Sequence, residues 1–464
     1  MLFNSYIFLF VFLPITYVIF WALRTAKQRY VWLTLTGYVF YGYWDPRFCL
    51  LMAFSTFVSY MAGLGLLRNT DPRIRRWYLI VPITVDLCLL GFFKYADFGL
   101  RTAESVLNVF GAQIELPILG IILPVGISFY TFHTITYIVD SYRGVIRPTS
   151  NLFEFSAYVS LFSQLVAGPI VRFRQIEKDL VQLGSADRTR WLGQGVSFFV
   201  IGLIEKVLVA DSLAHFVDPM LAEYQSLSSL GAWFAILGYT FQLYFDFCGY
   251  SDMAVGLGYL FGLRIPQNFN SPYKALSPSD FWRRWHISLS MCMRDYLYIP
   301  LGGNRHGEWG TYRNLMLTML IGGLWHGANW TFVVWGGYHG LLLMVYRRFA
   351  AVWDKAPTLV AQGVTFLLVV IGWVFFRSTD FSMAAHLLTT MFVPTDGKVI
   401  GDFVPFSVLL GFAGLWSIAG PNAFDLHGGF QWRQRYAFPL AVAFGVSLAI
   451  MAGGKSSPFL YFQF

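Results

Sequence analysis

Charged residues are scarce in this chain of 464 residues: Asp, Glu, Lys and Arg together make up 12% of it. This is about half of their share in a typical soluble domain. Hydrophobic residues make up 56% of the chain and aromatic residues 19%. So few charges would leave the surface of a soluble protein largely apolar. The composition therefore excludes soluble-enzyme folds for most of the chain and predicts a membrane protein.

Cysteine is also rare, and its pattern excludes a cysteine-based metal centre. The four cysteines form no CxxC pair and show no spacing typical of metal ligands. We interpret all of them as packing residues: Cys49, Cys88, Cys248 and Cys292. The sequence therefore predicts no metal site and no bound cofactor.

Several catalytic motifs and repeat patterns are missing as well. Walker, Rossmann, HExxH and GxSxG patterns do not occur, so nothing supports nucleotide hydrolysis, hydride transfer, zincin or lipase chemistry. We find no internal repeat of the kind that marks many transporters, no low-complexity tract and no long linker. Residues 1–464 are therefore expected to form a single helical domain.

Long apolar runs dominate what is present. At about 20 apolar residues per bilayer crossing, the chain can supply roughly 10 to 12 transmembrane helices, so the predicted fold class is an all-α, multi-pass membrane protein. The first run, 2–23, has no basic residues before it and no cleavage site after it, which predicts a retained span. The basic residues that follow, Arg24, Lys27 and Arg29, place its end in the cytoplasm. Further runs lie near 30–43, 48–67, 77–93, 117–139, 153–171, 194–210, 230–262, 315–346, 358–376, 403–419 and 436–453.

The net charge of +8 lies in short clusters between these runs, including the cluster from Arg68 to Arg76. Such clusters are typical of positive-inside anchoring. The basic balance therefore indicates contact with membrane lipid, and nucleic-acid binding is not expected.

Residues 264–314 form a polar, amphipathic or re-entrant region inside this apolar chain. Ser277 can cap a helix, Pro278 suits its first position, and Asp280 suits its positive end. Pro300 and the following glycines would end that helix. On it, His286 would share an apolar face with Trp282, Leu289 and Met293, a spacing that by itself favours a packed core histidine.

Residues 315–346 carry no formal charge and are too long for one straight span, about 48 Å against about 30 Å of hydrocarbon. The expected breaks are Gly322–Gly323 and the segment 325–330. His326 would lie about 16 Å into the run, near the bilayer midplane, where a titratable side chain is a functional candidate. Burial there favours the neutral imidazole that a general base needs. A hydrogen bond between helices is the alternative role.

Other polar side chains near these two histidines are candidate substrate-binding residues. Trp325 and Asn329 flank His326, and the polar region contributes Arg294, Asp295, Tyr298 and Arg305. The charged members could orient a polar or anionic substrate, but a basic helix at a membrane surface would show the same residues. Among the remaining histidines, His339 is expected to be structural and His133 to form a hydrogen bond between helices.

Six segments together resemble the membrane-bound O-acyltransferase family, and in particular its bacterial branch that acetylates exopolysaccharides. They are LPVGISFYTFHTITYIVDSYRG (123–144), LVAGPIVRF (165–173), YFDFCGYSDMAVGLG (244–258), FWRRWHISLSMCMRDYLYIPLGGNR (281–305), LWHGANWTFVVWGGYHG (324–340) and FLYFQF (459–464). The resemblance spans nearly the whole chain. Ser163, where the family often has proline, and His133, where it more often has glutamine, leave the subfamily open.

The resemblance implies a fold, a site and a reaction. The fold would be a helical ring with re-entrant segments around a central tunnel. His326 would match the catalytic histidine of the family and His286 its second functional histidine. An acyl group, from acetyl-CoA, an acyl carrier or another thioester, would pass to a hydroxyl of an exported polysaccharide such as alginate or cellulose, or to a serine on an extracytoplasmic partner protein. The location would be the inner membrane of a bacterium.

Three other functions stay open from the sequence. A D-alanyl transferase of teichoic acid modification would share the segments around His286 and His326, but usually on a shorter chain. A transporter or flippase would fit the composition and the interrupted helices. A passive scaffold of a polysaccharide secretion complex would fit the aromatic-rich loops.

Overall fold

The computed structural model describes residues 1–464 except 186, 400–401, 430–433, 455–458 and 461–464. Most of these described residues lie in helices, and the only sheet-like contact among them is an isolated bridge between Leu227 and Lys398. The all-α prediction is therefore confirmed. Packing groups the residues into two compact units: Met1–Leu192 with Leu257–Pro266, and Gly193–Gly256 with Gln267–Phe464. The expectation of a single functional domain stays a prediction.

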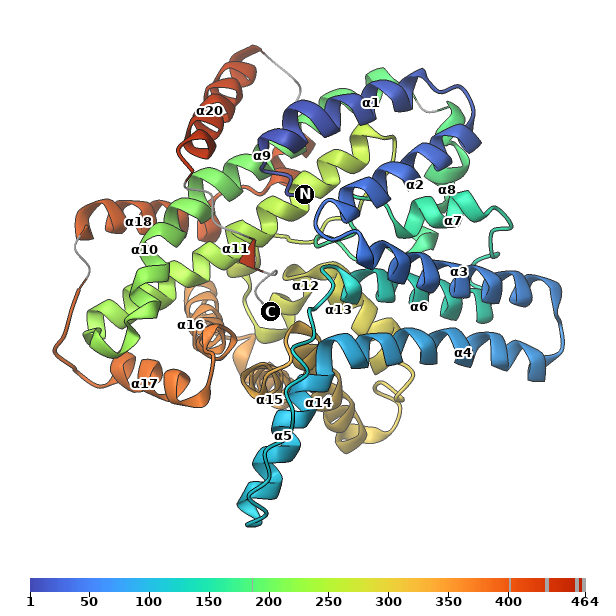
Figure 1. Cartoon of the computed structure of the whole chain (residues 1–464). Coiled ribbons are helices and arrows are strands. Elements are labelled where there is room, and N and C mark those ends of the chain that lie inside the picture. Colours follow the sequence, from blue (N-terminus) through green and yellow to red (C-terminus); the bar gives the residue numbers. More distant parts are fainter. Residues whose placement is uncertain (186, 400–401, 430–433, 455–458, 461–464) are drawn as a thin grey trace. The chain divides into compact units, whose positions relative to one another are not determined.

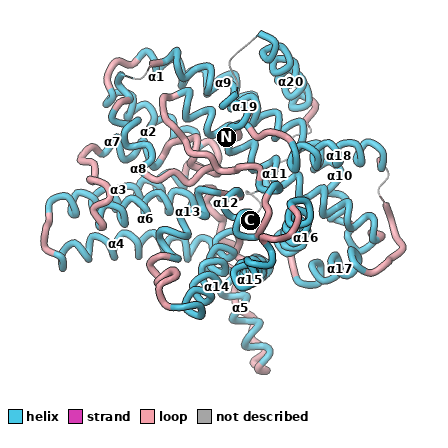
Figure 2. The backbone as a smooth tube through the Cα atoms, turned by 180° about the vertical axis from the view of Figure 1, so that it is seen from behind, coloured by secondary structure: helices cyan, strands magenta, loops and turns pink. Residues whose placement is uncertain are grey.

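The first unit is built from the N-terminal helices. Its elements are η1 (Phe8–Phe12), α1 (Leu13–Ala22), α2 (Ala26–Gly42), α3 (Arg47–Arg68), α4 (Pro72–Leu90), η2 (Gly91–Tyr95), α5 (Ala96–Val109), α6 (Ile127–Tyr142), α7 (Leu152–Val159), α8 (Phe173–Val181) and η3 (Leu183–Ser185). Figures 1 and 2 show α3, α4 and α6 side by side, with α5 turning away from the end of α4.

A buried carboxylate joins those three helices. Asp86 of α4 is 2% exposed, and it accepts hydrogen bonds from Ser55 of α3 at 2.6 Å and from Thr134 of α6 at 2.7 Å. A buried polar group without such donors would cost free energy. The two hydroxyls therefore specify how α3, α4 and α6 meet.

The second unit carries the polar region from Gln267 onward and both candidate histidines. Its elements are α9 (Arg188–Ile204, entered from the first unit), η4 (Glu205–Ala210), α10 (Asp211–Ala222), η5 (Tyr224–Ser226), α11 (Ser229–Leu260), η6 (Pro272–Lys274), α12 (Pro278–Arg284), α13 (Ile287–Met293), η7 (Arg294–Tyr298), α14 (Gly307–His326), α15 (Trp330–Trp353), α16 (Thr358–Arg377), α17 (Phe381–Phe392), α18 (Phe403–Ala419), α19 (Ala423–Gly429) and α20 (Gln434–Ala452). The last residues of α11 belong to the first unit.

The overlong apolar run divides into two helices, as predicted. The chain leaves the helical conformation at Gly327, and Asn329 caps the start of α15 by accepting a hydrogen bond from the Thr331 N–H at 3.1 Å. The other expected break is wrong, because Gly322 and Gly323 lie inside α14. Gly323 instead allows close packing: a Cβ there would lie 2.2 Å from the Phe332 carbonyl oxygen of α15.

Four expectations about single segments and residues are corrected. Helix α6 begins only at Ile127, and α7 ends at Val159, so parts of the apolar runs 117–139 and 153–171 are irregular. The ring nitrogens of buried His133 form no hydrogen bond within the described residues, and the ring instead packs on Tyr158. Cys88 is exposed, so it is not an internal packing residue, whereas Cys248 and Cys292 are buried.

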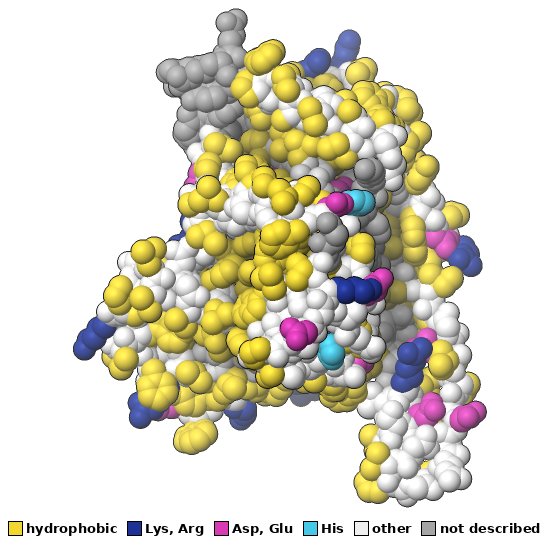
Figure 3. Space-filling view, turned by 90° about the vertical axis from the view of Figure 1, so that its left-hand side faces the viewer, with side chains coloured by type: hydrophobic (Ala, Val, Ile, Leu, Met, Phe, Trp, Pro, Cys, Tyr) yellow, Lys and Arg dark blue, Asp and Glu magenta, His cyan; other side chains and the backbone are white. Residues whose placement is uncertain are grey.

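The helices and their surface are those of a membrane protein. Among the described residues, three helical segments are long and apolar enough to cross a bilayer: Arg47–Arg68, Pro72–Val109 and Thr358–Arg377. Four shorter apolar helices accompany them: Phe8–Ala22, Phe381–Phe392, Phe403–Ala419 and Phe438–Ala452. Hydrophobic side chains are spread widely over the face in Figure 3, with few charged side chains among them. The number of 10 to 12 spans stays a prediction.

Replacing Gly323 by alanine should destabilise the pair formed by α14 and α15, because the added methyl group would press on backbone atoms that have little freedom to move. We expect a loss of about 1–3 kcal/mol in unfolding free energy, seen as a lower unfolding temperature of the detergent-purified protein. Gly322→Ala is the matched control, since a Cβ at Gly322 meets no atom within 4 Å. Equal unfolding temperatures for the two variants would contradict the packing argument.

Candidate functional site

His286 lies at a break between two short helices. Helix α12 ends at Arg284, Trp285 is extended, and His286 adopts left-handed backbone angles, φ 42° and ψ 55°, before α13 begins. The predicted continuous helix from Ser277 onward is therefore wrong beyond Arg284, although its start is confirmed. A left-handed histidine is strained by about 1–3 kcal/mol, and such strain gathers at functional sites. The break turns the His286 ring into the interior, where it is 0% exposed.

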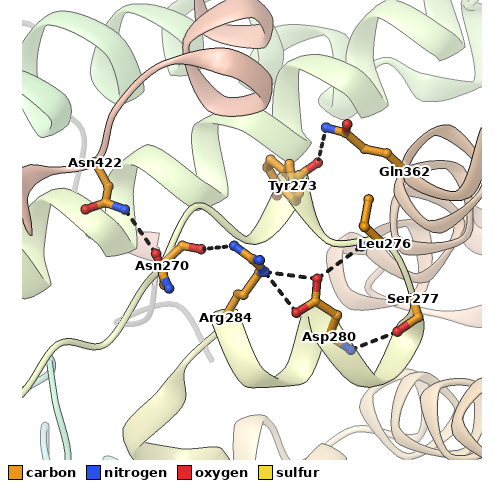
Figure 4. Close-up of polar contacts among 8 residues, drawn as sticks. All are labelled: Asn270, Tyr273, Leu276, Ser277, Asp280, Arg284, Gln362 and Asn422. Atoms are coloured by element: carbon orange, nitrogen blue, oxygen red, sulfur yellow. Dashed lines mark hydrogen bonds and ion pairs between the residues drawn. The ribbon is translucent and has the colours of Figure 1, made fainter. Parts of the chain in front are cut away.

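Polar contacts fix α12 in place before this break (Figure 4). Ser277 accepts a hydrogen bond from the Asp280 N–H at 3.1 Å, as predicted for an N-cap. The Asp280 carboxylate accepts hydrogen bonds from the Leu276 N–H at 3.1 Å and from Arg284 Nε at 3.0 Å. Arg284 also donates to the Asn270 carbonyl at 3.3 Å. These contacts join both ends of α12 to the preceding loop, so the position of His286 follows from them.

Asn268 holds the His286 ring directly. Its Oδ1 lies 3.1 Å from His286 Nδ1 and accepts hydrogen bonds from the Ser288 hydroxyl at 2.8 Å and the Ser288 N–H at 3.3 Å. Because the Ser288 N–H can only donate, the atom facing it must be the amide oxygen. Nδ1 of His286 then carries the proton, and Nε2 is the acceptor. Nε2 is buried and has no hydrogen-bond partner within the described residues.

His326 is the last residue of α14 and lies beside His286. It is 4% exposed, and its ring centroid is 6.3 Å from that of His286. Aromatic rings surround it at centroid distances of 5.0 Å for Trp325, 5.1 Å for Trp335 and 5.4 Å for Phe376. Two imidazoles separated by 40 residues of chain therefore share one aromatic enclosure, which has little access to water.

The two predicted neighbours of His326 occupy different environments. Trp325 is 6% exposed, and its ring centroid is 6.1 Å from that of His286 as well, so it contacts both histidines. Asn329 uses its side chain for structure: Oδ1 caps α15, and Nδ2 donates to the Thr379 carbonyl at 2.7 Å. The structure therefore brings Trp325, His286 and His326 together and gives Asn329 other partners.

The remaining candidate substrate residues lie at or near the surface after α13. Arg294 and Asp295 pair with each other at 2.8 Å at the start of η7. The Tyr298 hydroxyl donates to Asn304, and Arg305 is exposed in the same loop. A binding role for them stays a prediction.

Sequence reasoning missed several residues that shape the site. Asn268 and Ser288 position His286, and Phe247 of α11 packs edge-on against its ring at 4.7 Å. Trp335 and Phe376 come from α15 and α16. No pattern marks Asn268 in advance, because its role depends on a left-handed turn that the continuous-helix expectation did not include. His339 packs on the Trp335 ring at 5.0 Å, and its structural role stays a prediction.

One group of described residues has the ligand atoms of a metal site. Glu205, Cys248 and Asp252 are buried, and their ligand atoms lie within 4.8 Å of one another. The Cys248 thiol donates to Asp252 Oδ2 at 3.6 Å, so internal hydrogen bonding accounts for part of the cluster without an ion. The predicted absence of a metal stays a prediction.

Comparison with known proteins places the chain in a family. The sequence model of the membrane-bound O-acyltransferase family matches residues 119–383. Among similar proteins, the probable alginate O-acetylase AlgI of Pseudomonas aeruginosa is 45% identical over 84% of this chain and 75% of its own. The protein with the same name in Pseudomonas putida is 41% identical over the full length of both chains. The peptidoglycan O-acetyltransferase of Helicobacter pylori is 38% identical over 84% of this chain and 80% of its own.

The family match includes both His286 and His326, and their roles in the reaction stay predictions. The chain is an O-acyltransferase, and it belongs to the membrane-bound O-acyltransferase family.

Proposed function

We propose that this enzyme moves an acetyl group from a cytoplasmic thioester, acetyl-CoA or another acyl carrier, for O-acetylation of an exported polysaccharide. The observation that carries the proposal is the pair of buried histidines, whose ring centroids are 6.3 Å apart. The similar proteins named for acetylation of alginate and of peptidoglycan support a polysaccharide as the final acceptor. The inner membrane of a bacterium is the proposed location.

His326 is the proposed general base. The imidazole takes the proton from an acceptor hydroxyl while the hydroxyl oxygen attacks the thioester carbonyl carbon. When the tetrahedral intermediate collapses, the carbon–sulfur bond breaks, the imidazolium returns its proton to the leaving thiolate, and an ester and a free thiol result. Rings at about 5 Å on several sides of His326 support this role, because they exclude water that would hydrolyse the thioester.

His286 is the proposed second functional residue, acting through Nε2. Since Nδ1 bonds to Asn268, Nε2 can accept a hydrogen bond from the attacking hydroxyl and orient it toward His326. Trp325, which contacts the rings of both histidines, would form one wall of the space that holds the acyl group. Arg294 and Arg305 are the proposed contacts for the polar part of the donor. The acceptor hydroxyl belongs either to the sugar itself or to a serine of an extracytoplasmic partner protein.

Replacing His326 by alanine should abolish acetylation, because the step then lacks its base. We expect the transfer rate to fall by about 10²- to 10⁴-fold. The measurement is the acetyl content of the exported polysaccharide, by NMR, in strains that carry wild type or His326→Ala at matched membrane levels. His215→Ala is the control, since His215 is an exposed histidine of the same unit.

Full acetylation in the His326→Ala strain would show that His326 is not the general base. Acetylation that survives even when His286 is also replaced would favour the passive scaffold. Solute uptake that is lost without any change in acetyl content would favour a transporter. Ester-linked D-alanine in place of acetate would favour the D-alanyl transferase.

Replacing Asn268 by alanine should slow transfer without removing either histidine. The His286 ring would lose the acceptor that fixes its tautomer and orientation, and a misplacement of about 1 Å can cost about 100-fold in rate. We expect turnover of the purified enzyme to fall by about 10- to 100-fold at an unchanged KM for the thioester. Ser290→Ala is the control, because the Ser290 hydroxyl donates to the Trp285 carbonyl at 3.3 Å and not to the His286 ring. A raised KM with normal turnover would contradict the positioning role.

A further inference from the structure

The C-terminal residues Phe459 and Leu460 pack into the same unit as the candidate site. The Leu460 N–H donates to Asp246 Oδ2 of α11 at 2.9 Å, across 214 positions of sequence. Phe459 and Leu460 are 2% and 5% exposed. A short segment with both residues buried is an internal part of the unit and not a surface tail.

Asp246, which accepts the hydrogen bond from Leu460, belongs to a buried ion triad with Lys206 and Asp211. Lys206 Nζ lies 2.7 Å from Asp211 Oδ1 and 2.5 Å from Asp246 Oδ1. All three residues are 2–3% exposed. One lysine faces two carboxylates, and buried carboxylates need further hydrogen-bond donors. The Leu460 N–H supplies one to the second oxygen of Asp246. The triad therefore holds the C-terminal segment through a charge-assisted hydrogen bond.

Phe459 continues this contact toward the histidines. Its ring stacks on Tyr250 with centroids 4.6 Å apart, and it packs against Phe247 at 5.9 Å. Phe247 in turn meets the His286 ring edge-on, at 4.7 Å and an interplanar angle of 89°. Asp246, Phe247 and Tyr250 are near neighbours on α11. The anchor of Leu460 and the ring behind His286 are therefore adjacent residues of one helix.

We propose that Phe459 and Leu460 are positioning residues of the transfer site: Leu460 docks on Asp246, and Phe459 supports Phe247, which holds the His286 ring in place. The proposal rests on the proposed function, because it gives His286 a role in transfer. Asn268 bonds to one nitrogen of that ring, and the Phe247 ring packs against it at 4.7 Å. Phe459 packs against Phe247 at 5.9 Å, so removing the Phe459 ring gives Phe247 room to move away from His286.

The first experiment measures the position of His286 without depending on catalysis. Purified full-length protein is treated with diethyl pyrocarbonate, and mass spectrometry follows the modification of each histidine. In wild type, buried His286 and His339 should react slowly, and exposed His215 and His306 quickly. Phe459→Ala should raise the reactivity of His286 several-fold and leave that of His339 unchanged. Phe459→Leu, which keeps most of the volume, should stay near wild type, as should Phe438→Ala at an exposed phenylalanine.

A second pair of variants tests the anchor separately. Leu460→Pro removes the N–H that Asp246 accepts, whereas Leu460→Ala keeps it. We expect Leu460→Pro to behave like Phe459→Ala and Leu460→Ala to stay closer to wild type. In a transfer assay, Phe459→Ala and Leu460→Pro should lose on the order of 10- to 100-fold in turnover.

The outcomes separate this proposal from the proposed function. Unchanged His286 reactivity in both Phe459→Ala and Leu460→Pro overturns the positioning role, and so does an equal rise at His286 and His339, which would mean general loosening. If His326→Ala abolishes transfer while Phe459→Ala transfers normally, the proposed function holds and the positioning role fails. If His326→Ala remains active, the proposed function fails, and the reactivity of His286 still decides whether the C-terminal residues hold its ring.

Discussion

The hydrogen bond between Asn268 and His286 is the interaction on which the candidate site depends. His286 has left-handed backbone angles that cost a residue with a Cβ about 1–3 kcal/mol. Asn268 opposes this cost from both its backbone and its side chain. The backbone carbonyl of Asn268 accepts a hydrogen bond from the Ile287 N–H at 2.8 Å. Its side-chain Oδ1 accepts hydrogen bonds from His286 Nδ1 and from the Ser288 hydroxyl. Without these bonds, α12 would continue into α13 as one unbroken helix, and the His286 ring would point in another direction.

The second constraint is the aromatic enclosure around the two imidazoles. Rings from α11, α14, α15 and α16 contact His286 or His326, through Phe247, Trp325, Trp335 and Phe376. An enclosure of this kind places both imidazoles in apolar surroundings. In the proposed reaction it would also keep water from the thioester, so that acyl transfer is favoured over hydrolysis.

One residue of the buried ion triad and the ring that packs on His286 are next to each other on α11. The ion triad pairs Lys206 with Asp211 and Asp246, and the aromatic residue next in sequence, Phe247, faces His286. Helix α11 therefore carries a residue of the ion triad, Asp246, and a residue that packs on His286, Phe247, at consecutive positions. Asp246 therefore anchors Leu460 while the neighbouring Phe247 packs on the imidazole of His286.

The composition and the apolar runs were enough to predict an all-helical membrane protein, because lipid contact and the hydrogen-bonding needs of the backbone leave few other solutions. Local signals also worked where the cause is local. Ser277 caps α12, and the overlong run divides after His326 because glycine and asparagine there favour departure from helix. The quoted motifs indicated the family, and the resemblance made both histidines candidates, although spacing alone favoured a packed core histidine at position 286.

Tertiary contacts decided the rest. The turn at His286 is imposed by Asn268, which lies 18 residues earlier in the chain, and the segment around His286 gives no local sign of it. The 6.3 Å approach of His286 to His326, and the docking of Leu460 on Asp246, join segments far apart in sequence. Such contacts follow from packing and from the pairing of buried polar groups, which no periodic pattern in the sequence encodes.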